Sequence, residues 1–254
     1  MAMKFGLKKK HSEGEPFVLI HIHIQKSAGR SLNTMLRKVY PETSQGDASH
    51  QPIHLKIQDM DQCRRKEISL VAGHCLYGVH KLFPQRAVYL CILREPVSRL
   101  FSLYKYIART EHHPVHAKLT EVADGFGGFL EFVQEVPGLL TEVHSGQMRR
   151  IAGNMSPKFV GKEQELFDAA VEHLAAPNMR FGFTEDFERY VRGLVSEGLV
   201  PPLEMVRVNS SPPGSDLEEV LSALTPDQKT LLNRYVYWDL KLYEAALRIQ
   251  QQSR

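Results

Sequence analysis

Residues 17–40, with the sequence FVLIHIHIQKSAGRSLNTMLRKVY, decide the fold expected for this chain. The first eight residues are typical of a buried strand, and the apolar residues after the loop follow the spacing of one helix face: Leu32, Met35, Leu36 and Val39. A strand that enters a helix through a short loop points backbone N–H groups at one place, where the helix dipole adds positive charge. Lys26 adds a full positive charge, and Ser27 and Ser31 add hydroxyl donors. The segment therefore predicts a site for an anion such as phosphate.

The loop does not match the common nucleotide-binding motifs. A Walker A loop requires G-x-x-x-x-G-K-[ST], and no glycine precedes Lys26 at that spacing. The dinucleotide motif G-x-G-x-x-G is absent from the sequence as well. On this segment alone, an ordinary strand–turn–helix with a solvated lysine stays open as the alternative.

The composition indicates a globular protein with a mild positive charge. The chain has 254 residues, 43% of them hydrophobic and 24% charged, and a net charge of +3. This charge suits anionic small molecules but is too weak to indicate nucleic-acid binding, so we expect no nucleic-acid partner. No apolar run reaches the ~18–20 residues of a membrane span. Residues 1–15 are expected to form a flexible basic tail, and they lack the apolar region of a secretory signal.

The cysteine pattern argues against a disulfide framework and against a structural zinc site. There are three cysteines, Cys63, Cys75 and Cys91, and no C-x-x-C pair among them. Together with the missing signal and membrane span, this predicts a protein of the reducing cytoplasm.

Further strands and helices predict a single domain over residues 16–254. SLVAG (69–73) and AVYLCIL (87–93) are continuous apolar runs, typical of parallel strands that are covered on both faces. A helix of about three turns is expected after Pro96, and residues 41–66 are expected to form a long surface connection. Other helices are predicted near 126–135, 145–152, 163–175 and 186–197, short strands at 179–184 and 204–209, and a long closing helix from Thr225-Pro226-Asp227-Gln228.

The alternation of strands and helices favours a doubly wound α/β sheet. In such sheets, ligands bind at the carboxyl ends of the strands. Lys26, His74 and Arg94 each lie just beyond the end of a predicted strand, which supports the predicted anion site.

Three segments at these positions resemble a known family. HIQKSAGRSL (23–32) resembles the 5′-phosphosulfate loop of sulfotransferases that use 3′-phosphoadenosine 5′-phosphosulfate (PAPS), above all the heparan sulfate 2-O- and 6-O-sulfotransferases. ILREPVSRLFSLY (92–104) is similar to their 3′-phosphate segment, and AGHCLYGVH (72–80) to the stretch with the catalytic histidine. Weaker similarity follows in the family's order at SGQMRRIAG (145–153), FGFTEDFERYV (181–191), VRVN (206–209) and DLKLYEAAL (239–247).

The resemblance implies a P-loop-like sulfotransferase fold, with a mainly parallel central sheet flanked by helices. It implies transfer of the PAPS sulfonate to an acceptor hydroxyl on a carbohydrate, with His74 as base and Lys26 stabilising the leaving phosphate, and no metal. The residues implied for the 5′-phosphate are Lys26, Ser27, Ala28, Gly29, Arg30, Ser31 and Leu32, and those for the 3′-phosphate are Arg94 and Ser102. Arg30 replaces a usual threonine, and its contact with phosphate is left open.

Several other residues allow two interpretations. Arg99 is expected to form a structural ion pair, whereas Arg149 and Arg150 are either cations of the site or part of a solvated helix face. His21 and His23 are expected to pack in the core, with the cavity border as the alternative for His23. The histidines of HHPVHAK (112–118) lack the spacing of a zinc site. Trp238 is expected to pack the closing helix onto the sheet.

Two other functions compete with the sulfotransferase. The first is a P-loop-like phosphotransferase that uses a nucleoside triphosphate and magnesium, which the missing Walker A glycines disfavour. The second is a catalytically silent nucleotide- or glycan-binding protein of the same fold, since a fold alone does not establish an activity.

Overall fold

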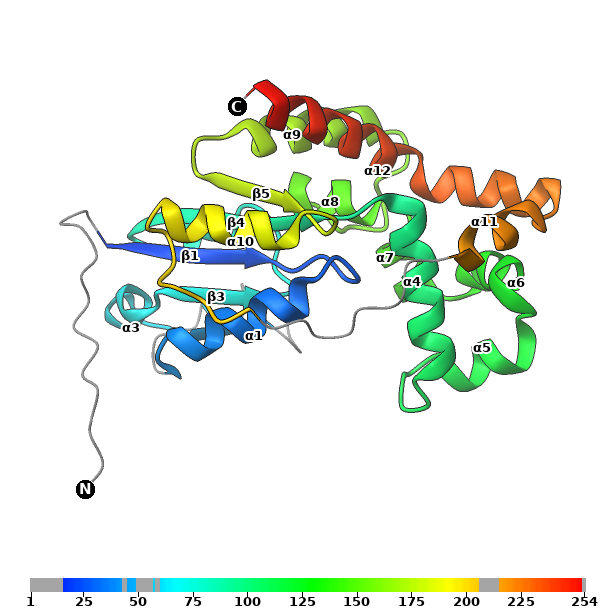
Figure 1. Cartoon of the computed structure of the whole chain (residues 1–254), viewed down its shortest axis with the longest axis horizontal. Coiled ribbons are helices and arrows are strands. Elements are labelled where there is room, and N and C mark those ends of the chain that lie inside the picture. Colours follow the sequence, from blue (N-terminus) through cyan, green and yellow to red (C-terminus); the bar gives the residue numbers. More distant parts are fainter. Residues whose placement is uncertain (1–15, 43–44, 49–56, 58–59, 206–214, 253–254) are drawn as a thin grey trace.

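The fold is organised around a parallel sheet, with a group of helices beyond its carboxyl edge (Figure 1). The computed structural model describes residues 16–42, 45–48, 57, 60–205 and 215–252. The tail expected at 1–15 and the VRVN segment at 206–209 lie outside these residues.

Five strands form the sheet in the order β2-β3-β1-β4-β5, and every neighbouring pair is parallel. The strands are β1 (Phe17–Ile22), β2 (Gln45–Ala48), β3 (Leu70–Gly73), β4 (Arg86–Leu93) and β5 (Met179–Phe183). β1 pairs with β3 on one side and with β4 on the other, so the strand order reverses at β1. The predicted parallel α/β fold is confirmed.

Both faces of the sheet are covered, as the continuous apolar strands predicted. Along β4, Tyr89 and Cys91 pack in one apolar cluster, while the alternate residues Leu90 and Ile92 pack in another. The first cluster includes side chains of α8 (Gly146–Ala152), α9 (Glu163–Ala175) and α12 (Pro226–Gln252). The second includes α1 (Gly29–Val39) and α10 (Phe187–Ser196). The period of two along a strand thus supplies one cluster on each face.

The helices beyond the carboxyl edge have an apolar core of their own (Figure 1). This core includes Phe101, Phe129 and Tyr235, which come from α4, α6 and α12. The elements of this group are α4 (Pro96–Arg109), α5 (His116–Val122), α6 (Gly125–Phe132), η3 (Val133–Glu135), α7 (Pro137–Val143) and α11 (Ser215–Ser222). The first half of α12 packs on this group and its second half packs on the sheet cluster, so α12 joins the two parts.

The capping residues predicted for α12 are confirmed. Thr225 Oγ1 accepts the backbone N–H of Gln228 at 3.2 Å, and Gln228 Oε1 accepts the backbone N–H of Thr225 at 3.1 Å. Pro226 occupies the first helical position, where its missing N–H has no intrahelical acceptor. Trp238 packs against Phe167 of α9, with 5.6 Å between the ring centroids, and so reaches the sheet cluster through that helix.

The prediction for residues 41–66 was wrong in part. The segment contains β2 and most of α3 (Gln62–Glu67). Asp61 caps this helix, since its carboxylate accepts the N–H of Arg64 at 2.7 Å. The sequence of β2, QGDA, has no strand-forming residues, so its pairing with β3 decides its structure. No strand is present at Glu204 or Met205, and residues 206–209 lie outside the described part of the chain. η2 (Val79–Leu82) and helices α5, α7 and α11 were not predicted.

Candidate active site

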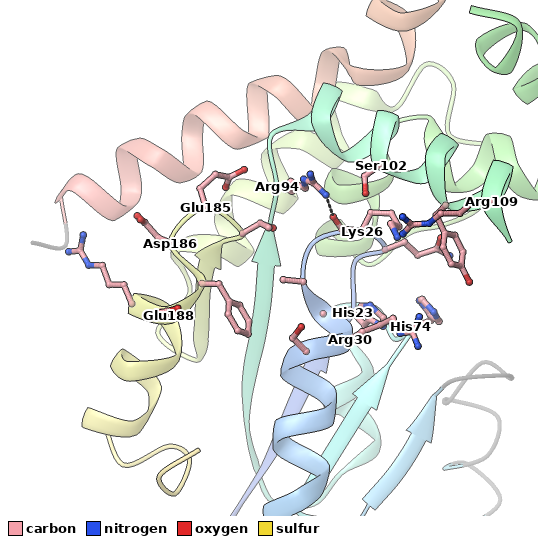
Figure 2. A pocket seen from close by; sticks show the side chains of 18 of the residues that line it. His23, Lys26, Arg30, His74, Arg94, Ser102, Arg109, Glu185, Asp186 and Glu188 are labelled. Carbon is pink, nitrogen blue, oxygen red and sulfur yellow. Dashed lines mark hydrogen bonds between the residues drawn. The ribbon is translucent and has the colours of Figure 1, made fainter. Parts of the chain in front are cut away.

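A cavity of about 940 Å³ lies at the carboxyl edge of the sheet, where the strand order reverses (Figure 2). Lys26 follows β1, His74 follows β3 and Arg94 follows β4, and all three side chains line this cavity. This is the position at which parallel α/β sheets bind ligands. The predicted site residues on its wall are Lys26, Ala28, Gly29, Arg30, Ser31, His74, Arg94 and Ser102.

The loop between β1 and α1 is held in an unfavourable backbone conformation. Lys26 has φ of 65° and Ala28 has φ of 57°, in the left-handed region that side chains disfavour. Each such residue costs about 1–3 kcal/mol, and such strain concentrates at functional sites. The carbonyl of Lys26 accepts a hydrogen bond from the Arg94 guanidinium at 3.0 Å, which ties the loop to the end of β4.

The start of α1 faces the cavity with backbone donors. The N–H groups of Ser31 and Leu32 donate to the carbonyl of Ala28. The N–H groups of Gly29 and Arg30 have no hydrogen-bond acceptor among the described residues. Ser27 and Leu32 were predicted to bind the cofactor, but neither lines the cavity. Both are fully buried, and Leu32 packs in the core beneath α1. Leu32 is therefore a core residue, because its side chain points to the sheet.

The ammonium group of Lys26 lies in a cationic and half-buried environment. Its Nζ lies 4.3 Å from the ring centroid of Tyr106, one turn beyond Ser102 on α4. Burial, followed by the charges of Arg109, Arg94 and Arg30, lowers the pKa of Lys26 to about 8. Positive charges therefore dominate this end of the cavity, and an anion bound there would be attracted by all of them.

Arg94 is positioned by residues from distant parts of the chain. Gln147 on α8 accepts the N–H of Arg94 at 3.1 Å and donates its amide to the Arg94 carbonyl at 2.9 Å. Asp239 on α12 in turn accepts the N–H groups of Gln147 and Met148 at the start of α8. Burial is the main effect that lowers the pKa of Arg94, and nearby glutamates oppose it.

The imidazole of His74 stacks on that of His23, with 4.8 Å between ring centroids and 15° between ring planes. Figure 2 shows both rings beside Arg30 at one end of the cavity. The prediction that both strand histidines pack in the core is therefore right for His21, which is fully buried, and wrong for His23, which lines the cavity.

The opposite end of the cavity carries acidic residues from the β5–α10 turn and from the first turn of α10. Glu185, Asp186 and Glu188 line the wall there and lie on the far side of Arg94 from the histidines (Figure 2). The turn is attached to the end of β4, because the N–H of Thr184 donates to the carbonyl of Leu93 at 2.8 Å. Arg189 and Arg192 of α10 line this end as well, and Arg192 pairs with Glu188 at 3.0 Å. The cavity therefore has a cationic end and an end where acidic and basic side chains are mixed.

The other arginines of interest have structural contacts. Arg99 forms the predicted ion pair, at 3.3 Å from Asp239, with both side chains almost fully buried. Arg149 donates to the carbonyls of Thr141, His144 and Ser156. Arg150 pairs with Glu142. Both alternatives for Arg149 and Arg150 were wrong, since these side chains are buried and do not line the cavity.

The remaining predicted residues have ordinary positions. His113 lines the cavity and meets the edge of the Tyr106 ring at 5.7 Å, whereas His112 is exposed and His116 contacts the carbonyl of Ile107. All three cysteines are free thiols. No helix in the described part of the chain has the length and apolar character that a membrane span requires.

Sequence reasoning missed several residues of the site, among them the acidic residues of the wall and Tyr106, Arg109, Gln147 and Asp239. Tyr106 follows Ser102 at the i+4 spacing of one helix face, so that spacing was a usable signal. Arg109 lies one turn further along the same helix. Gln147 and Asp239 carried no local signal, because each acts through a contact with a residue more than 50 positions away.

The fold and the site together define a parallel α/β protein with a cationic cavity at the reversal point of its sheet. No protein-family model matches the chain, and no curated protein sequence matches it.

The solved structures to which the chain is similar include two sulfotransferases. One is the mouse sulfotransferase SULT7A1 complexed with PAP, at 13% identity over 93% of this chain and 88% of that chain, with a TM-score of 0.48. The other is a sulfotransferase from Alicyclobacillus acidocaldarius, at 15% identity over 91% of this chain and 99% of that chain, with a TM-score of 0.46. At these values neither similarity carries a functional assignment, which rests on the residues of the cavity.

Proposed function

We propose that this protein is a sulfotransferase that moves the sulfonate of PAPS to an acceptor hydroxyl on a carbohydrate. The observation that supports this most is the convergence of four predicted residues on one cavity. Lys26, His74, Arg94 and Ser102 come from three separate strand ends and a helix, and all line the same wall. The motifs that resemble the PAPS-dependent family are therefore neighbours in space as well as in order along the sequence.

The residues present fit a ligand with two phosphate groups. Lys26 and the first-turn N–H groups of α1 would hold the 5′-phosphate, because helix N-termini attract anions. Arg94 would hold the 3′-phosphate, since a guanidinium forms paired hydrogen bonds with phosphate oxygens, and Ser102 would add a hydroxyl donor. A cavity of about 940 Å³ lies within the size range of small-molecule sites. PAPS would supply the sulfonate group to this site.

Each of the two catalytic residues has one task. His74 would accept the proton of the acceptor hydroxyl, a role that suits an imidazole at neutral pH. Lys26 would neutralise the negative charge that develops on the phosphate side of the breaking bond. The proton would end on His74, and the charge would remain on the phosphate that faces Lys26.

The basic side chains of the cavity wall favour a polar acceptor. Arg30 and Arg109 are both exposed and line the cavity, and in the described residues neither forms an ion pair. Charged side chains of this kind suit a carbohydrate better than an apolar sterol, because an apolar ligand would leave them without hydrogen-bond partners.

A first experiment tests the nucleotide site by calorimetry with adenosine 3′,5′-bisphosphate (PAP). We expect the wild-type protein to bind, and Arg94→Ala to bind about 10- to 100-fold more weakly, because a hydrogen bond to a charged group contributes about 1.5–3 kcal/mol. Arg248→Ala is the matched control, since Arg248 is exposed on α12 and, within the described part of the chain, its ion-pair partner is Glu244. Absence of binding to the wild-type protein would refute the nucleotide assignment.

A second experiment tests the reaction with ³⁵S-labelled PAPS across glycans, phenols, lipids and steroids. We expect transfer to glycans, and we expect it to persist in EDTA. Strict dependence on magnesium, with transfer of phosphate from a nucleoside triphosphate, would instead support the phosphotransferase. Binding of PAP without transfer to any acceptor would support the silent binding protein.

A further inference from the structure

His23 connects the anion loop to His74 through its backbone and its ring. Its backbone N–H donates to the carbonyl of Gly73 at 2.9 Å, and Gly73 immediately precedes His74. Its ring stacks on the His74 ring at 4.8 Å. The two histidines therefore lie side by side, each one residue beyond the end of its strand in the register that pairs Ile22 with Gly73.

The ring of His23 packs against Gly29, the first residue of α1. A Cβ atom placed on Gly29 would lie only 2.1 Å from Cδ2 of His23 and 2.7 Å from Nε2. Gly29 is therefore required by the His23 ring, because any larger residue at position 29 would displace it. The His23 ring also stacks on the ring of the buried His21, with 5.8 Å between ring centroids, and His21 contacts Asn33 of α1.

The surroundings of His23 keep its ring uncharged. Burial, followed by the charges of His21, His74, Arg150 and Arg30, lowers the pKa of His23 to about 2. These groups belong to β1, the end of β3, α8 and α1, so cationic or titratable neighbours approach the ring from four elements. A ring that does not accept a proton at neutral pH is a poor general base, but it is a stable flat surface for a neighbour.

We propose that His23 is a positioning residue for the reaction. Its ring packs against Gly29 and forms a flat surface that directs the imidazole of His74 into the cavity. The proposal rests on the proposed function, since it gives His23 a task in catalysis only where His74 acts as the base. His23 itself transfers no proton. Its contribution is to hold the His74 imidazole in one orientation, because a small misplacement of a reacting group can lower a rate by about 100-fold.

The test compares two substitutions of His23 with the wild-type protein. His23→Phe keeps a flat ring at this position, whereas His23→Leu removes it and keeps an apolar side chain. We expect H23L to lower kcat by about 10- to 100-fold with little change in acceptor KM or PAP affinity, and H23F to recover most of the wild-type rate. His112→Leu is the matched control, because His112 is exposed and outside the cavity lining.

A second readout does not depend on activity. Proton NMR of the His74 ring protons should show a ring-current shift in the wild-type protein and in H23F that H23L lacks. Wild-type turnover by H23L, or an H23F variant as slow as H23L, would overturn the proposal. If H23L does not fold, H23F decides: retained rate and His74 shift support the positioning role, and loss of both overturns it.

Failure of the proposed function gives a different result. Absence of sulfonate transfer by the wild-type protein would refute the function, whereas the NMR comparison would still report on the stack. An unchanged His74 spectrum in H23L would overturn the positioning role whatever the activity of the protein.

Discussion

Gln147 provides the most specific test of how this site is assembled. Its side chain is 1% exposed and forms two hydrogen bonds with the backbone of Arg94, at 3.1 Å and 2.9 Å. We consider Gln147→Met, which keeps a side chain of similar length and removes both hydrogen bonds. The matched control is Gln134→Met, because Gln134 is exposed on η3 and outside the cavity lining.

The expected loss of stability follows from these two bonds. Each contributes about 0.5–1.5 kcal/mol net, so Q147M should lower the free energy of unfolding by about 1–3 kcal/mol. In a chain of this size, 1 kcal/mol corresponds to about 2–4 °C in Tm, so the expected decrease is about 5 °C. Scanning fluorimetry measures it, and Q134M should melt with the wild-type protein.

The functional consequence is separate from the loss of stability. Without Gln147, the backbone of Arg94 is no longer held, and its guanidinium loses the orientation that paired hydrogen bonds with phosphate require. We expect PAP affinity to fall about 10-fold, which corresponds to about 1.4 kcal/mol. Calorimetry below the melting temperature measures this change. A Q147M protein that melts earlier but binds PAP with wild-type affinity would refute the reasoning, because Arg94 would then keep its place without Gln147.

Three further predictions concern protons and buried charges. Burial lowers the folded-state pKa of His21 and of His144 to about 4, so the unfolded chain binds more protons between pH 6.5 and 4. Acidification from pH 7.5 to 5 should therefore destabilise the protein by on the order of 1–2 kcal/mol for each histidine, and urea titrations with equal midpoints at both pH values would contradict this. Because the pKa of Lys26 is lowered to about 8, PAP binding at pH 8 should take up about half a proton. Calorimetry in two buffers of different ionisation enthalpy measures the uptake, and Lys26→Met should remove it. Asp239→Leu should destabilise the protein by about 3–5 kcal/mol, because it leaves Arg99 buried without its counter-ion. A variant whose Tm lies within about 2 °C of that of the wild type, as expected for a surface substitution, would show that the Arg99–Asp239 ion pair does not stabilise the fold.

The core elements of the fold were predictable because their signals are local. The apolar runs that became β1, β3 and β4 and the periodicity of α1 and α4 lie within short windows. The capping residues Thr225 and Gln228 act three positions apart, and both predicted bonds are present. β2 was missed because its structure comes from pairing with β3, which lies more than 20 residues further along the chain.

The sequence by itself determined the strand–loop–helix at 17–40, and with it the placement of Lys26, His74 and Arg94 just beyond strand ends. In a parallel sheet, the carboxyl ends of neighbouring strands meet at one edge, so these three residues had to converge once the strands were recognised.

Only the tertiary structure decided what surrounds those residues. The stacking of His23 on His74, the clamp of Gln147 on Arg94 and the contact of Lys26 with Tyr106 join segments that are 51 to 80 residues apart in the chain. Such contacts depend on how helices pack on the sheet and on each other, and no local period encodes them. Gly29 illustrates the difference: the sequence indicates a loop glycine, whereas the structure shows that the ring of His23 leaves room for no other residue.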